Sequence, residues 1–147
     1  MTRKADFNAE EWERVVRGPV LAGLRVIAAH RGGTLRESMS MGRVYAEARR
    51  AHGESELLDE IVSSKPELDH TRYRSAEELR EHGLQHLRDA VALLAQKATP
   101  QELDSYRRFA RDLAERVAHA HRERDGSDGV GDAERAALDE IGSALGS

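Results

Sequence analysis

The sequence has 147 residues and no cysteine, which fits a single domain and excludes disulfide bonds and thiolate metal sites. A domain of this size buries roughly two thirds of the surface that its unfolded chain exposes, so a core can form without disulfide bonds or a structural metal ion. The 27 acidic and 23 basic residues give a net charge of −4, which argues against nucleic acid as a partner. Since the sequence contains neither an apolar run of 18 residues nor a signal-type segment, we expect a soluble cytoplasmic protein without membrane insertion.

The first helix signals lie close to the amino terminus. Asn8 and Glu11 have the capping-box spacing, which predicts a helix beginning directly after Asn8. Gly18 and Pro19 follow within three turns, and proline is costly inside a helix but favourable in its first turn. We therefore predict a break at this position and a second helix over 19–30.

Five further helices follow from the same kind of signal. Thr99, Pro100 and Glu102 combine an N-cap, a first-turn proline and a capping-box partner. The apolar spacing that includes Met39 and Tyr45 predicts the buried face of the third helix. No segment has the alternation of a half-buried strand, so we expect no sheet. The five helices are predicted over 34–52, 55–63, 75–97, 99–121 and 132–145.

These elements predict an all-α fold, a single domain over 1–147 with about seven helices around an aliphatic core. Two stretches 91 positions apart carry matching residues, which indicates an internal pseudo-repeat over about 19–52 and 110–146. We expect the two copies to pack face to face through Val26 and Val117. The matching residues are Arg25, Val26, Ala29, His30 and Arg31 in the first copy and Arg116, Val117, Ala120, His121 and Arg122 in the second.

A glycine-rich acidic turn precedes the last predicted helix and is the strongest candidate for a metal site. Its carboxylates belong to Asp125, Asp128, Asp132 and Glu134. Hard cations such as Ca²⁺ or Mg²⁺ prefer oxygen ligands, and glycines let several of them point at one centre. The spacing is not that of an EF-hand loop. The alternative is a hydrophilic connection in which Asp132 only caps the helix.

A pair of histidines suggests a second kind of metal chemistry. His82 and His86 are four residues apart on a predicted helix, a spacing at which two imidazoles can hold zinc. Gly83 occupies the position where a zinc protease carries its general base, so the motif is incomplete. Packing of His86 against the core is the alternative interpretation. Because no nucleophile elbow or phosphate-binding loop occurs, the sequence predicts no catalytic residues and a protein that is not an enzyme.

Arginines are concentrated in the predicted helix over 99–121 and just beyond it. Acidic residues alternate with them at helical spacing, so we interpret this face as a solvated surface on which the charged side chains form ion pairs. The arginines are Arg107, Arg108, Arg111, Arg116, Arg122 and Arg124.

The carboxyl-terminal part of the chain, mainly over 100–147, resembles the TerB-like proteins, a bacterial family associated with tellurite resistance and stress. The resemblance rests on an Ala/Val-rich helix, an Asp-Gly turn at 125–126, an acidic helix start at 132–134 and a final Leu-Gly at 145–146. It implies an all-α, pseudo-duplicated domain whose acidic turn residues bind divalent cations. It also implies a non-catalytic component of stress assemblies. The first turn, over 31–34, lacks the acidic contribution that the family pattern would place there.

Three functional hypotheses follow. The leading one is a non-catalytic TerB-like module that binds a protein partner and is tuned by a divalent cation at the turn over 125–134. The second is a metal-dependent hydrolase that uses His82 and His86. The third is a structural homo-oligomer that buries an apolar strip of one helix against a second copy.

Overall fold

The computed structural model describes residues 2–28, 34–51, 55–63, 75–125 and 132–146. Across these residues the chain forms α-helices and one short 3₁₀ turn and contains no strand, so the predicted all-α class is confirmed. The elements are η1 (Lys4–Asp6), α1 (Ala9–Ala28), α2 (Thr34–Arg50), α3 (Glu56–Ser63), α4 (Ala76–Lys97), α5 (Pro100–Asp125) and α6 (Asp132–Leu145).

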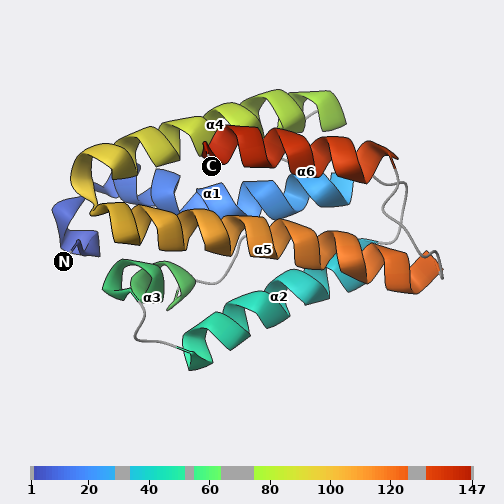
Figure 1. Cartoon of the computed structure of the whole chain (residues 1–147), viewed down its shortest axis with the longest axis horizontal. Coiled ribbons are helices and arrows are strands. Elements are labelled where there is room, and N and C mark those ends of the chain that lie inside the picture. The colour runs from blue at the N-terminus through green and yellow to red at the C-terminus, as the bar shows by residue number, and fades with distance from the viewer. Residues whose placement is uncertain (1, 29–33, 52–54, 64–74, 126–131, 147) are drawn as a thin grey trace.

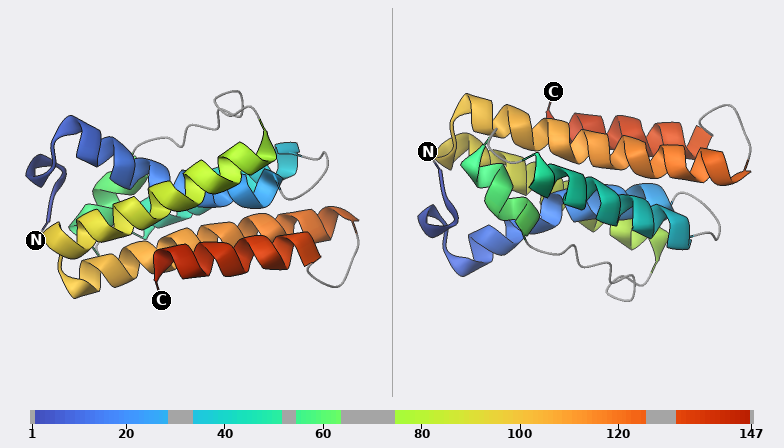
Figure 2. Two further views of the ribbon diagram at one scale, coloured as in Figure 1. Left: turned by 90° about the horizontal axis from the view of Figure 1, so that it is seen from above. Right: turned by 90° about the horizontal axis from the view of Figure 1, so that it is seen from below.

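Helix α1 is the central element of the bundle (Figure 1). It packs most extensively against α4 and α5, and α6 lies on α4 and α5. Helices α2 and α3 lie on the other side of α5 from α6, as the views in Figure 1 and Figure 2 show. Helix α5 therefore separates two surface regions, one bounded by α2 and α3 and the other by α6.

Capping hydrogen bonds confirm several of the predicted helix starts. The side chain of Asn8 accepts from the backbone N–H of Glu11 at 2.8 Å, and Glu11 Oε1 accepts from the N–H of Asn8 at 2.9 Å. Thr99 and Glu102 form the same reciprocal pair at 3.1 and 2.8 Å. Ser75 caps α4 in the same way through its hydroxyl. Each cap satisfies backbone groups that the first turn of a helix leaves without partners.

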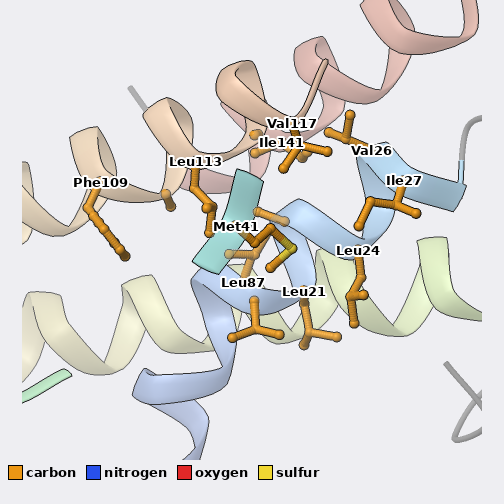
Figure 3. Packing of buried hydrophobic residues seen from close by; sticks show 14 of the residues in the cluster. Leu21, Leu24, Val26, Ile27, Met41, Leu87, Phe109, Leu113, Val117 and Ile141 are labelled. Carbon is orange, nitrogen blue, oxygen red and sulfur yellow. The ribbon is translucent and has the colours of Figure 1, made fainter. Parts of the chain in front are cut away.

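The predicted break at Gly18 and Pro19 is wrong, because α1 continues through both residues. The described part of the chain therefore has six α-helices, whereas seven were predicted. Proline at position 19 offers no N–H to the carbonyl of Val15, and Tyr106 of α5 donates its hydroxyl to that carbonyl at 2.8 Å instead. The ribbon of α1 changes direction part-way along its length (Figure 3), as expected for a helix with an internal proline.

Apolar side chains from all six helices form the core, part of which is drawn in Figure 3. The prediction that Met39 faces the core is wrong, since its exposed fraction is 52%, whereas Met41 is fully buried. Among the α2 side chains that the structure describes, the buried apolar ones are Met41, Val44 and Tyr45. They follow three- and four-residue steps, and Met39 lies off this stripe. Packing of α2 against α5 and α1 thus determined its buried face.

The pseudo-repeat is not confirmed. Val26 and Val117 are both fully buried and lie close together beside Ile141 (Figure 3). However, the helices that follow them pack differently: α2 lies mainly along α5, whereas its supposed counterpart α6 packs most extensively on α4 and less on α5 and α1. The turns over 29–33 and 126–131, on which the comparison of the two copies depends, lie outside the described residues.

Candidate functional site

The predicted cation site is only partly covered by the structure. Asp125 is the last residue of α5 and Asp132 the first residue of α6, while Asp128 lies outside the described residues. Glu134, in the first turn of α6, is buried with an exposed fraction of 3%. Among the side chains that the structure describes, no three histidine, aspartate or glutamate residues are grouped to hold a metal ion. Cation binding by this turn therefore stays a prediction.

The two histidines of α4 lie at a surface groove between α1 and α4. The groove has a volume of about 370 Å³, and Glu10, Glu13 and Arg14 contribute to it from α1. His86 is half-buried, and its Nε2 lies 2.9 Å from the carbonyl oxygen of Arg14. Because a carbonyl oxygen only accepts, Nε2 must carry the proton. The exposed His82 joins it at the groove, but the described residues add no third ligand to this pair.

Burial and nearby positive charges disfavour the protonated form of the His86 ring. Burial lowers the pKa of His86 below its ordinary value of 6.5. The hydrogen bond to Arg14 opposes this shift, and the positive charges of Arg17 and Arg14 strengthen it. The side chain thus serves as a hydrogen-bond donor to the backbone of α1, next to the carbonyl of Val15 that Tyr106 satisfies. This environment supports the interpretation that His86 packs against the core. Among the described residues no third metal ligand joins the two histidines, as the hydrolase hypothesis would require.

A second groove lies between α5 and the pair formed by α2 and α3, and we call it the α2–α5 groove. Its volume is about 390 Å³. Apolar side chains contribute to its lining, and two arginines and two aspartates add charge. Phe109 also packs edge-on against the buried ring of Tyr45, with ring centroids 5.2 Å apart, so this part of the lining is held in place by the core. The lining residues are Ala48, Ala51, Leu58, Asp59, Ser105, Arg108, Phe109, Arg111 and Asp112.

A third groove lies between α5 and α6, and we call it the α5–α6 groove. Its volume is about 680 Å³. A Cβ atom built on Gly142 would have no neighbour within 4 Å, so this position is open. Ala114 and Ile141 are buried beneath the groove, and Leu138 is half-buried. The charged residues that line it are Arg111, Glu115, Arg135 and Asp139.

Ion pairs hold the helices that form these grooves. Glu140 of α6 pairs with Arg80 of α4 at 2.6 Å and with Arg25 of α1 at 3.4 Å. Arg116 of α5 forms two hydrogen bonds with Glu47 of α2, at 2.8 and 3.1 Å. Arginine and carboxylate groups match well in such paired contacts. The walls of both α5 grooves are therefore fixed by contacts between helices as well as by the core.

The side chains of Arg122 and Arg124 lie outside the described part of the structure, and the other arginines of α5 do not form one uniform ion-paired face. Arg107 donates to the carbonyl of Leu145 at 2.7 Å, at the end of α6, and Arg116 binds Glu47. Arg111 is half-buried, lines both grooves of α5, and makes no hydrogen bond or ion pair within the described part of the chain. The sequence shows the spacing of these residues but not which neighbours they reach. The separate environment of Arg111 was therefore missed.

Comparisons with models of protein families, with curated proteins and with solved structures gave no match. In the parts of the chain that the structure describes, no helix is both long and apolar enough to span a membrane.

Proposed function

We propose that this protein is a non-catalytic helical module of the TerB-like kind that binds a protein partner in a bacterial stress response. The observation that supports the proposal best is the α2–α5 groove, which has an apolar lining of Phe109, Leu58 and Ala48. It also contains the charge of Arg111, which has no partner among the described residues. Amphipathic helices dock in grooves of this character through spaced apolar side chains. The half-buried guanidinium favours a partner that carries a carboxylate beside its apolar anchor.

The partner proposal is tested by blocking the groove without disturbing the core. A tagged chain first captures its partner from the native host, and the purified partner is then titrated against variants. Ala51 is exposed and lines the α2–α5 groove, so we expect Ala51→Trp to weaken binding at least about tenfold. Arg111→Ala is also expected to weaken binding of the partner.

Ala92 supplies a matched control, because it is an exposed alanine on α4 that lines none of the three grooves described above. Ala92→Trp adds the same indole to a different surface and is expected to leave the affinity unchanged. Equal affinities of Ala51→Trp, Arg111→Ala and the wild-type chain would contradict docking in this groove.

We also propose that a divalent cation at the turn over 125–134 tunes this module. Calorimetric titration with Ca²⁺ and with Mg²⁺ is expected to give heat that Asp128→Asn reduces. A ligand present at 100 times its Kd should add about 2.7 kcal/mol to the free energy of unfolding. Glu81→Gln, which neutralises an exposed carboxylate of α4 that lines none of the three grooves, is the control. Absence of both binding heat and a shift in melting temperature would remove the cation from the proposal.

A further inference from the structure

The α5–α6 groove is lined by four charged side chains that have no partner in the part of the chain that the structure describes. Within the described residues, Arg111, Glu115, Arg135 and Asp139 make no hydrogen bond or ion pair. Two of them are basic and two are acidic, so the groove carries no net charge from these residues. A surface of this kind is matched by one that presents the same number of charges in the opposite order.

The order of these charges along each helix is the important feature. On α5, Arg111 precedes Glu115 by four residues, and on α6, Arg135 precedes Asp139 by four residues. Residues four apart lie on the same face of a helix, so each helix presents a basic group followed by an acidic group. A helix that runs in the opposite direction with the same order therefore places its basic group against the acidic group of the first.

A two-fold axis that lies in the interface, perpendicular to α5 and α6, places basic groups against acidic groups for both helices at once. Under such a rotation, α5 faces α5 of a second copy in antiparallel orientation, and α6 faces α6. Arg111 then lies opposite Glu115 of the second copy, and Arg135 lies opposite Asp139. Isologous interfaces require this type of self-complementary surface.

We propose that the α5–α6 groove is the interface of a homodimer, in which the four α5 and α6 helices of two copies form a bundle. Leu138 is half-buried in the groove and becomes part of the centre of this bundle, and the open space at Gly142 accommodates side chains of the second copy. The interface uses a different groove from the one proposed for the protein partner. Because Arg111 lines both grooves, the two proposals are distinguished by variants of residues that line only one of them.

The test is the oligomeric state of charge-reversed chains, measured by sedimentation equilibrium over a range of concentrations. Arg135→Glu places two acidic groups opposite one another, and Asp139→Arg places two basic groups opposite one another. Each variant alone is expected to dimerise about tenfold more weakly than the wild-type chain, because the reversed pair occurs twice in the dimer. An equimolar mixture of the two variants is expected to restore the dimer, since each basic side chain then meets an acidic one.

Two further variants test the groove independently of charge. Gly142→Trp fills the groove and is expected to abolish the dimer. Gly42 of α2 is a matched control, because it too is a helical glycine with no neighbour within 4 Å of an added Cβ atom. Gly42→Trp is expected to dimerise like the wild-type chain.

The proposal is overturned by a wild-type chain that stays monomeric up to about 1 mM. It is also overturned by a dimer that Arg135→Glu, Asp139→Arg and Gly142→Trp leave unchanged, or by a mixture of the two charge variants that dimerises no better than either alone. Ala51 and Arg135 line different grooves, so loss of partner binding in Ala51→Trp and loss of dimers in Arg135→Glu are separable results.

Discussion

The hydroxyl of Tyr106 donates to the carbonyl oxygen of Val15 at 2.8 Å and replaces the N–H that Pro19 cannot supply. Tyr106 is fully buried, so water does not reach this carbonyl as an alternative donor from the Tyr106 side. A buried carbonyl without a donor costs free energy, and this one would otherwise lie in the middle of α1. The contact between α1 and α5 therefore allows α1 to remain one helix across a proline.

We expect Tyr106→Phe to lower the free energy of unfolding by about 1 to 3 kcal/mol, because it leaves the Val15 carbonyl without a donor. In a Pro19→Ala background residue 19 regains its N–H, so the cost of Tyr106→Phe is expected to be smaller. Urea denaturation of the wild-type chain, the two single variants and the double variant measures this coupling. Strictly additive effects would show that the hydroxyl does not substitute for the missing N–H.

Tyr45 provides a matched comparison. It is also buried, but its hydroxyl has no hydrogen-bond partner within the described residues. Because no bond of this kind is lost, Tyr45→Phe is expected to be neutral or stabilising, within about 1 kcal/mol, by the same denaturation measurement. A loss as large as that of Tyr106→Phe would contradict the distinction between the two hydroxyls.

Gly18 is required by the position of Tyr106. A Cβ atom at residue 18 would overlap the Tyr106 hydroxyl oxygen, so Gly18→Ala is expected to cost about 1 to 3 kcal/mol despite the better helix propensity of alanine. Tyr106→Phe should reduce this cost, because it removes the overlapping atom. Gly83 of α4 is the control: its added Cβ would meet Leu21 at an ordinary 3.8 Å, so Gly83→Ala is expected to stabilise by about 0.5 to 1 kcal/mol. Thermal melting distinguishes these opposite signs.

His86 predicts a loss of stability on mild acidification. Burial lowers the pKa of His86 in the folded chain below its ordinary value of 6.5, so the unfolded chain binds this proton more readily. The free energy of unfolding should therefore decrease as the pH falls below about 6.5. His86→Gln keeps a donor for the Arg14 carbonyl and does not titrate, so its stability should depend less on pH in this range. Equal slopes for both chains, measured by urea denaturation between pH 5 and 8, would contradict the assignment of the effect to His86.

Several features of the fold were predictable from the sequence because their causes are local. Asn8 with Glu11 and Thr99 with Glu102 act within three residues, so their helix starts appear in the structure as predicted. The choice between Met39 and Met41 was not predictable in this way. Both are methionines on one helix, and the packing of α2 against other helices, including Gly23 of α1 beside Met41, decided which of them is buried.

The candidate sites depended even more on distant contacts. The spacing of His82 and His86 was correctly seen as one face of α4, but the partner of His86 is a carbonyl of α1, 72 positions away. Similarly, Arg107 and Arg111 are four residues apart on α5, but Arg107 donates to the carbonyl of Leu145, whereas Arg111 lines two grooves. Sequence periodicity reports which side chains share a face, but it does not report what that face meets.

The sequence by itself determined the all-helical class and the positions at which most helices begin, since capping groups and apolar periodicity act over one or two turns. Only the tertiary structure decided that α1 continues through Pro19, because the donor that satisfies Val15 comes from Tyr106, 91 positions away. It also decided where the grooves of α5 lie. Those grooves form where helices from different parts of the chain meet, and no local interaction specifies that meeting.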